Sequence, residues 1–583
     1  MIIFILFFIS IFFVILGYGL LIKQLLKNEN LVNTLGIGET GLLGFYLILI
    51  ISISLHFFLT INHYVVFGVY VLGFILFYIY KNNLDFISKK KYYLLIIILI
   101  FPALISIKGH PDFEWYHLPY INYLRDFKII FGVANINDFL GFSQTWIDIL
   151  ALLRFPNIGA KGSNIIPAVF AIFFLFSLIE LLSKKNRSNV DIFIYLILIV
   201  FISKFNKVSE YGGHVPPILI GILINIYFFK LMIEINQNYK EIIFKILIFF
   251  SFVLLLRINY IFILPLILYI LIKFNLEILN FIKNKKIIFL LIFIPALYFS
   301  KNFIHTGCFS YPVDSTCFSK DKISWSVGKE YAKLRYDGIQ AGVRGWNQHI
   351  LIDGNIEDRI DYLIPLKENK ILSHSQYVKK YIKENNFHWL KYWIHSGDVI
   401  KILNNIIIIL FSLIILFLTN KIFYLNKKET NKYSFLLLGI FFLQLILWFL
   451  LTPQTIYGGD VAVVVFVAAT CVFFLRKIDF SFKKNLLSIV FLFVLSISYF
   501  EYKNFNRIYN EYFKDLDNSK HFPWIKIKKN ILNKDYFFIN VNDVKINVKN
   551  KTKGRKLGLA DECGNIDMLC IPIERVQCIE KIV

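Results

Sequence analysis

The residues of this chain best placed to do chemistry lie in the segment HPDFEWYHLPY, residues 110–120. It follows the hydrophobic run 92–107 and brings Asp112, Glu114 and His117 close to an expected membrane boundary. Carboxylates and imidazoles are the groups that accept and donate protons in general acid–base catalysis. Charged groups are costly near a bilayer, so this cluster is a functional candidate. The alternative is a polar loop with aromatic interface anchors.

The composition predicts the elements that must hold this segment. The chain has 583 residues, of which 57% are hydrophobic, and its mean hydropathy is +0.62. Recurrent long apolar runs predict an all-α polytopic membrane protein, because helices satisfy their own backbone groups in a bilayer. The formal net charge of +24 suggests a nucleic-acid partner. We expect none, since the lysines gather in short clusters between apolar runs, where they set membrane orientation.

We expect about fourteen spans, and several of the runs are shorter than the usual spanning length. The pair 241–256 and 258–273 is alternatively a re-entrant hairpin, or one long helix broken near Pro265. The first run has no basic n-region and no cleavage site after it, so we expect a retained helix rather than a signal peptide. The predicted limits are 2–22, 41–61, 64–80, 92–107, 165–182, 190–203, 215–233, 241–256, 258–273, 286–304, 400–419, 433–451, 460–475 and 485–500.

The basic residues predict how the spans are oriented. The odd-numbered connections are rich in lysine, as in Lys89–Lys91 and Lys283–Lys286, whereas 452–459 has no basic residue. Because positive charge stays in the cytoplasm, the odd connections are expected inside. Both termini, the segments 108–164 and 305–399, and the tail after residue 500 are then outside.

Cysteine positions agree with this orientation. Cys308 and Cys317 are close together in an expected outer segment, which favours a disulfide in an oxidising compartment. Cys563 and Cys570 are candidate disulfide cysteines in the outer tail, but Cys578 leaves three there, so the pairing stays open. No histidine accompanies either group at zinc-ligand spacing, which disfavours a metal site.

The chain divides into two expected domains. Residues 1–500 form a multi-span transmembrane domain, and residues 501–583 form a small α+β domain outside the membrane. The tail opens as a polar helix, and the alternating runs DYFFINV and DVKINVK predict two strands. In the first outer segment, LPYINYLRDFKIIFG has apolar residues at helical spacing and predicts a helix lying in the membrane interface.

Several motifs carry a resemblance to a known class. The segment DFEWYHLPYINYL looks like the first outer-loop signature of GT-C membrane glycosyltransferases, where an acidic pair precedes an aromatic residue and an interfacial helix. The chain more closely resembles a group of bacterial polytopic proteins linked to surface polysaccharide. The acidic motif follows the fourth span here rather than the first, and TPQTIYGG lacks the arginine expected after its proline. The matching pieces are YHLPYINYL, FGVANIND, SEYGGHVPP, LRINYIFILPL, YPVDSTCFS, TPQTIYGG and DECGNIDMLCIP.

The resemblance implies a transferase that moves a sugar from a polyprenyl-phosphate donor to a glycan or lipid acceptor. It would act on the outer face of the bacterial cytoplasmic membrane. Such a reaction needs a base for the acceptor hydroxyl and stabilisation of the departing phosphate. Asp112 is the candidate base, since desolvation would raise its basicity. Glu114 would orient it or hold a divalent cation, Mg²⁺ or Mn²⁺, or is a solvated acid at a helix start.

Cationic and polar residues expected on the outer face are candidates for the donor phosphate. A guanidinium such as that of Arg257 matches phosphate geometry, although an arginine at this depth also snorkels to the interface. Lys204 and Lys207 would widen a phosphate funnel or are simple loop charges. His117 would bind phosphate or pack among aromatic rings. The candidate substrate-binding residues are His117, Tyr116, Arg257, Lys204, Lys207 and His214.

Two other functions compete with the transferase. A transporter of surface-polysaccharide precursors should place polar residues at mid-membrane on discontinuous helices, often in inverted repeats. The expected spans have few charges at their centres, and we find no internal repeat. A polymerase or ligase of lipid-linked glycans would share most features of a transferase.

The alternation of basic connections predicts the outcome of a topology experiment. Reporter fusions after Arg187, Lys286 and Lys428 should report the cytoplasm, and a fusion after Ile360 should report the outside, because positive loops stay inside. A cytoplasmic signal at Ile360 would contradict the whole orientation.

Overall fold

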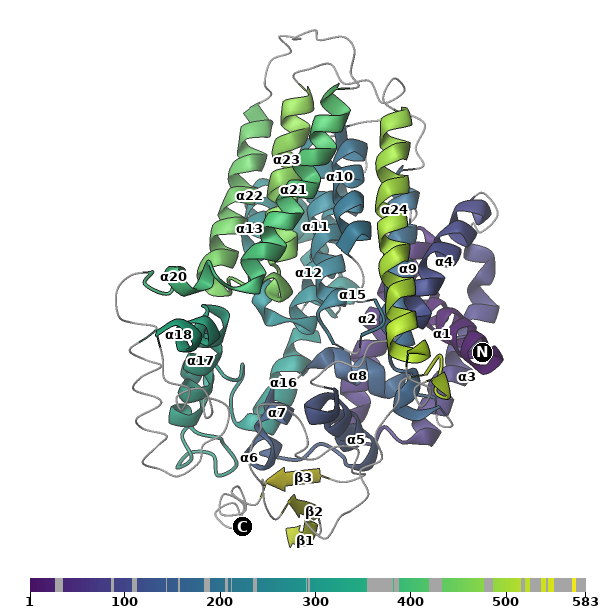
Figure 1. Cartoon of the computed structure of the whole chain (residues 1–583). Helices are drawn as coiled ribbons and strands as arrows, with labels where there is room; N and C mark the ends of the chain where they lie inside the picture. The colour runs from purple at the N-terminus through teal and green to yellow at the C-terminus, as the bar shows by residue number, and fades with distance from the viewer. Residues whose placement is uncertain are drawn as a thin grey trace.

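The structure of this chain is a computed structural model. It describes residues 1–26, 35–84, 89–106, 113–142, 144–155, 158–182, 189–204, 208–210, 212–233, 239–289, 291, 294–353, 381, 387–418, 432–476, 486–514, 519–524, 536–541, 544–549 and 569–572. Within this part, long helices pack side by side, and short helices, loops and a small sheet gather at one end (Figure 1).

The long helices come from three stretches of the chain. The first four are α1 (Ile2–Leu26), α2 (Ile37–His56), α3 (His63–Tyr80) and α4 (Lys90–Ile105). The middle group is α9 (Ile165–Leu182), α10 (Asn189–Lys204), α11 (Val215–Ile233), α12 (Tyr239–Leu256), α13 (Leu264–Lys273) and α16 (Ile294–Thr306). The last group is α21 (Gly397–Leu418), α22 (Lys432–Leu451), α23 (Gly459–Arg476) and α24 (Leu486–Ile508).

Short elements connect these helices. Between α4 and α9 lie the π-helix η3 (Phe113–His117), α5 (Leu118–Asp126), α6 (Val133–Ile136), α7 (Asp138–Gly141) and α8 (Thr145–Leu152). After α12 come the 3₁₀-helix η5 (Ile258–Ile263), α14 (Asn275–Lys283) and α15 (Lys285–Ile288). Between α16 and α21 lie η7 (Asp314–Thr316), α17 (Lys329–Val343), α18 (Trp346–Asp353) and α20 (Leu390–Trp393). The remaining turns are η2 (Lys81–Asn83), η4 (Gly159–Gly162), η9 (Thr455–Tyr457) and η10 (Tyr509–Phe513).

The expectation of a helical membrane protein is confirmed, but the expected number of spans is not. Seven helices in the described part of the chain are long and apolar enough to cross a membrane, or eight if one bent pair is counted. Each of the other expected spans has a helix that is short, charged or broken. At 16 residues, α4 and α10 are short, and α12 begins with Lys240, Glu241 and Lys245. The apolar runs Phe435–Leu451 and Gly459–Leu475 are also shorter than 18 residues.

The first three helices pack unusually closely because glycines line their contacts. A Cβ atom on Gly17 of α1 would lie 2.0 Å from the backbone oxygen of Gly73 in α3. On Gly19, it would lie 1.9 Å from the backbone oxygen of Thr40 in α2. Small residues let helix backbones approach in this way in membrane proteins, where dispersion contacts drive association.

The expected spans 241–256 and 258–273 divide at Arg257, as predicted, and the alternative of one long helix broken near Pro265 is wrong. Arg257 has extended backbone, φ −157°, and separates α12 from η5. Pro265 instead lies in the first turn of α13, where a proline costs no hydrogen bond. A further bend of 95° separates Ile258–Lys273 from Asn275–Phe281. The neighbouring expected span 286–304 is likewise divided, into α15 and α16.

Two buried ion pairs join the segments between the long helices to their neighbours. Lys301 of α16 pairs with Asp148 of α8, and both side chains are fully buried. Burial raises the pKa of Asp148, and the charge of Lys301 opposes that rise. Arg335 of α17 pairs with Asp138 of α7 at 2.6 Å. The two segments expected outside the membrane are therefore connected to each other and to the helices.

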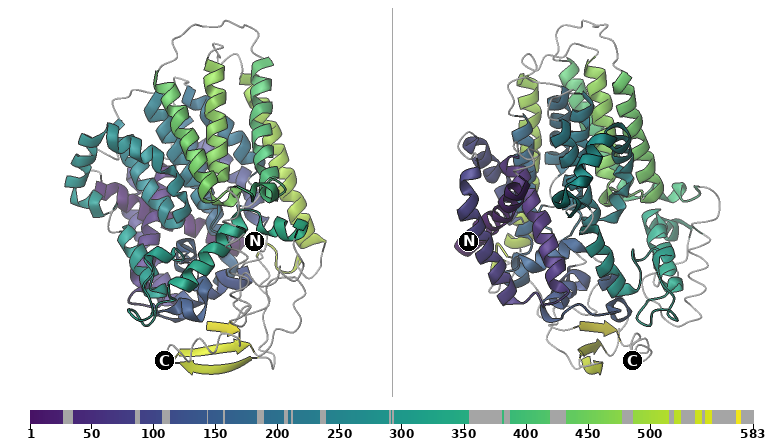
Figure 2. Two further views of the ribbon diagram at one scale, coloured as in Figure 1. Left: turned by 90° about the vertical axis from the view of Figure 1, so that its left-hand side faces the viewer. Right: turned by 180° about the vertical axis from the view of Figure 1, so that it is seen from behind.

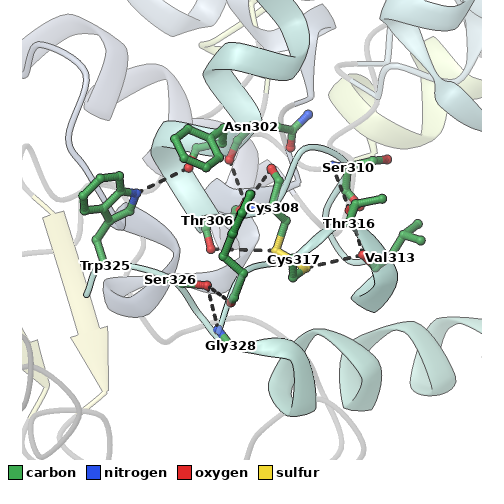
Figure 3. The surroundings of a disulfide bond; sticks show 12 residues. Asn302, Thr306, Cys308, Ser310, Val313, Thr316, Cys317, Trp325, Ser326 and Gly328 are labelled. Atoms are coloured by element: carbon green, nitrogen blue, oxygen red, sulfur yellow. Dashed lines mark hydrogen bonds between the residues drawn. A yellow bond between two sulfur atoms is a disulfide. The ribbon is translucent and has the colours of Figure 1, made fainter. Parts of the chain in front are cut away.

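Cys308 and Cys317 form a disulfide, as predicted (Figure 3). The loop they close is fastened by hydroxyl groups: Thr306 Oγ1 donates to the backbone oxygen of Asn302 at 2.7 Å and accepts from the Cys308 amide at 3.0 Å. Gly307 precedes this loop with φ +71°, and a Cβ there would lie 2.5 Å from Ser326. The third described cysteine, Cys471, is a buried free thiol in α23. Cys563 and Cys578 lie outside the described residues, as does the side chain of Cys570.

A small sheet lies at the lower end of the molecule in both views of Figure 2. Strand β1 (Tyr536–Val541) pairs antiparallel with β2 (Val544–Lys549), and β3 (Leu569–Pro572) pairs parallel with β2. The first two strands occupy the alternating runs in which strands were expected.

Replacing Lys301 should destabilise the fold. Lys301→Met leaves Asp148 as an unpaired buried charge, which typically lowers the free energy of unfolding by about 3–5 kcal/mol. Thermal denaturation of detergent-solubilised protein measures this, and the double variant Lys301→Met, Asp148→Asn should regain most of the loss. Lys333→Met is the matched control, because Lys333 and Asp314 form a solvent-exposed pair at 3.9 Å. Equal losses in the two single variants would contradict the prediction.

Candidate functional site

A cavity of about 860 Å³ lies between α10, α21, α23 and α24, within the size range of ligand sites in proteins. These helices come from distant parts of the sequence and run side by side in Figure 1. The loop before α11 and the loop before α23 close one end of the cavity. Its lining therefore combines residues 199–218, 401–412, 455–460 and 492–503.

Charged residues line one end of this cavity. Lys204 ends α10, Lys401 lies in the first turns of α21, and Lys503 lies near the end of α24. His214, Glu210 and Asp460 belong to the same lining. All of these residues stand at the ends of helices that were expected on the outer face, so three cations and two carboxylates share one end of the cavity.

The other end of the cavity is apolar. Its lining includes Ile407 and Phe411 of α21, Leu492 and Leu495 of α24, and Ile199 of α10. Lys401 and Phe411 are ten helical residues apart, which corresponds to about 15 Å along the axis. This is about half of the roughly 30 Å hydrocarbon thickness of a bilayer. The cavity therefore extends along the helices for about the depth of one leaflet.

Each of the three lysines has described partners at the charged end. Lys204 lies 3.7 Å from Asp460 and donates to the backbone oxygen of Lys401 at 2.6 Å. Lys401 contacts the carboxylate of Asp398 at 3.3 Å. Lys503 donates to the backbone oxygen of Ser203. These contacts restrain the three side chains at the charged end of the cavity.

The two carboxylates that contact these lysines, Asp460 and Asp398, also accept hydrogen bonds from uncharged donors. Asn405 Nδ2 donates to Asp460 at 2.8 Å, and Thr455 Oγ1 donates to Asp398 at 2.6 Å. Thr455 belongs to the loop TPQTIYGG. This loop is positioned by Gly458, which has φ +101° and on which a Cβ would lie 2.2 Å from the ring of Phe262.

The second outer segment is fastened to the same loop. Arg344 Nη2 donates to the backbone oxygen of Leu450 at 2.7 Å, and Gln454 Nε2 donates to that of Gly342 at 3.3 Å. Trp393 Nε1 donates to the backbone oxygen of Pro453. The segment 329–353 and α20 thus hold the loop that supplies Thr455 and Ile456 to the cavity.

The structure brings two of the predicted substrate-binding residues, Lys204 and His214, into the cavity lining. Arg257 lies close by, with its guanidinium 5.0 Å from the ring centre of Tyr457, the residue after Ile456 of the lining. Lys207 lies outside the described residues.

The acidic motif is described only in part. Asp112 lies outside the described residues, and of Glu114 only the backbone, in η3, is described. Tyr116 stacks on Phe139 of α7 with ring centres 5.3 Å apart, and His117 is buried. Neither Tyr116 nor His117 is part of the cavity lining, and their described surroundings are those of a packed aromatic core.

The described chain before this motif ends next to α24, one of the helices that surround the cavity. Ser106 is the last described residue before it, and its Oγ donates to Oδ1 of Asn504 at 3.1 Å. Asn504 is the neighbour of Lys503 in α24.

Across the described residues, no group of three or more His, Cys, Asp or Glu is arranged to hold a metal ion.

Sequence reasoning missed Lys401, Lys503, Asp398 and Asp460. Their signal was available in part, since each lies where an apolar run meets a polar segment expected outside, and charges at such positions are functional candidates. The sequence does not reveal that α10, α21 and α24 pack around the same cavity.

The comparisons with known proteins identify a family without an assigned activity. No curated protein and no solved structure matches the chain. The model of the family described as "Domain of unknown function (DUF8201)" matches residues 1–356. This match includes α10 and the loop before α11, and ends before α21. Because it spans more than half of the 583 residues, the chain belongs to the DUF8201 family.

Proposed function

We propose that this protein is a membrane glycosyltransferase that takes a sugar from a polyprenyl-phosphate donor at the outer face of the cytoplasmic membrane. The observation that carries this proposal is the cavity, in which three lysines stand at the end of an apolar groove one leaflet deep. A lipid phosphate has the same division, with an anionic head and an apolar tail.

The charged end suits a phosphate. Ammonium groups form charge-assisted hydrogen bonds to phosphate oxygens, and such bonds are about twice as strong as neutral ones. Lys204, Lys401 and Lys503 come from three different helices, so together they surround a bound anion. When a glycosyl–phosphate bond breaks, negative charge grows on the departing phosphate, and cations fixed beforehand stabilise that charge.

The depth of the cavity favours an enzyme over a transporter. A transporter must offer a path across the whole membrane, with polar groups near its centre. Here the lining reaches about half the hydrocarbon thickness, and its charged groups lie at one end. A polymerase or ligase of lipid-linked glycans would use the same donor chemistry with another acceptor.

The wider architecture fits an outward-facing active site. The segments 113–155 and 305–353 and the sheet lie in the lower part of Figure 1, and α24, the helix that carries Lys503, ends in that direction. The proposal places this end outside the cytoplasm, with both termini and the C-terminal domain on that side. The disulfide between Cys308 and Cys317 supports this side as the oxidising one.

Removing a cavity lysine should weaken donor binding. Lys204→Ala, Lys401→Ala and Lys503→Ala each remove a hydrogen-bonding charge, a loss of about 1.5–3 kcal/mol, so affinity for a polyprenyl phosphate should fall roughly tenfold or more. Binding of a fluorescent polyprenyl phosphate to purified protein in detergent measures this. Lys333→Ala is the control, since Lys333 belongs to the exposed pair with Asp314. Unchanged affinity in all three cavity variants would refute the proposed donor site.

Narrowing the apolar end should select against long lipid tails. Ser496 of α24 lines the cavity, and Ser496→Leu should displace about two methylene groups of the lipid, each worth about 0.8 kcal/mol of burial. Affinity for a long-chain polyprenyl phosphate should fall roughly tenfold, while that for a short isoprenyl phosphate stays within about twofold. Ser488→Leu is the matched control, because Ser488 is buried on the same helix but does not line the cavity. Equal losses for both chain lengths would contradict the groove as the tail site.

A further inference from the structure

The ion pair between Lys204 and Asp460 lies where two cavities meet. Both residues line the large cavity, and both also line a second one of about 110 Å³. The second cavity is otherwise mostly apolar, with walls from Ile197, Ile222 and Val464. The two side chains are about one quarter and one third exposed, so the pair faces open space rather than packed protein.

Lys204 has two described partners, and neither is a negative charge at hydrogen-bond distance. Its ammonium group lies 3.7 Å from Asp460 Oδ1, beyond the 2.7–2.9 Å of a strong charge-assisted hydrogen bond, and its shorter contact is to a neutral backbone oxygen. A phosphate in the large cavity offers this ammonium a closer and more highly charged partner. Anion binding therefore competes with Asp460 for Lys204.

We propose that Asp460 is the general base of the transfer reaction and that donor binding releases it for this role. The inference rests on the proposed function. In the free protein, Lys204 keeps part of the Asp460 charge neutralised. When the donor phosphate draws Lys204 away, Asp460 keeps the hydrogen bond that Asn405 donates to Oδ1, and its carboxylate loses the neighbouring positive charge.

The distances suit this division of labour. A phosphate oxygen bound to Lys204 at about 2.8 Å would lie at most about 6.5 Å from the Asp460 carboxylate. In inverting sugar transfer, acidic groups about 6.5–9.5 Å apart leave room for the attacking oxygen between the base and the anomeric carbon. Movement of Lys204 toward a phosphate in the large cavity widens the gap into that range.

The chemical step is balanced without a further reactant. The acceptor hydroxyl oxygen forms a bond to the anomeric carbon and gives its proton to Asp460. The bond between the anomeric carbon and the phosphate oxygen breaks, and its electron pair stays with the polyprenyl phosphate. Lys401, Lys503 and Lys204 hold the charge that remains on this leaving group.

Other carboxylates are less suited to the role. Asp398 does not line either cavity and is held by Thr455 and Lys401. Glu210 lines the large cavity, but it is 4% exposed and lies within electrostatic range of Arg507. Asp112, the base expected from the sequence, lies outside the described residues and is the competing assignment.

Two measurements on the full-length protein separate the parts of this inference. Asp460→Asn keeps the acceptor atom for Asn405 but cannot take a proton or hold Lys204. Transfer from a polyprenyl-phosphate sugar should fall roughly 10²–10⁴-fold, as for a lost general base. Affinity for the polyprenyl phosphate should stay equal or become up to about fivefold tighter, because the competitor for Lys204 is gone. Asp314→Asn is the control and should keep most transfer, because Asp314 belongs to the exposed pair with Lys333.

The outcomes that overturn the inference are distinct. Near-normal transfer by Asp460→Asn, with loss in Asp112→Asn, would return the base role to Asp112 and leave the proposed function intact. Weaker lipid-phosphate binding in Asp460→Asn would refute the competition for Lys204. A wild-type protein that binds the lipid phosphate but transfers no sugar would refute the proposed transferase, and with it the base role of Asp460.

Discussion

A charge at the edge of an apolar groove is held in place only by the polar groups beside it, because hydrocarbon offers it nothing. In this protein the constraint falls on Lys204, Lys401 and Lys503. Lys204 and Lys503 are restrained by neighbours from other helices, and Lys401 by Asp398 of its own helix. The helices α10, α21 and α24 are therefore bound to each other through the residues that line the cavity. Most of the contacts that stabilise the three charges are therefore also contacts between the helices that surround the cavity.

The segments between the long helices extend this arrangement. Arg344, Trp393 and Gln454 fasten the second outer segment to the loop that borders the cavity. The buried pair of Arg335 and Asp138 connects that segment to the first one. A ligand that shifts the 452–459 loop would therefore also displace both segments, because connected hydrogen bonds and ion pairs transmit small movements.

The sequence allowed the helices to be located but not their packing. Apolar runs predicted 165–182 and 215–233 with the limits that α9 and α11 have. The run 241–273 divides at residue 257, where the two spans were expected to meet, and the break comes from the extended backbone of Arg257 and not from a proline. Lys204 and His214 were found because they border spans. Lys401, Lys503 and Asp460 were missed because only the folded chain brings residues 199–218, 401–412 and 492–503 together.

The six-residue 3₁₀-helix η5 changes how far its part of the chain reaches. A 3₁₀-helix rises about 2.0 Å per residue and an α-helix about 1.5 Å, so Ile258–Lys273 extends about 27 Å instead of about 24 Å. These sixteen residues are therefore about as long as an α-helix of eighteen residues. The number of residues in a helix then understates its reach, and a segment that looks too short can approach the full thickness of the hydrocarbon layer.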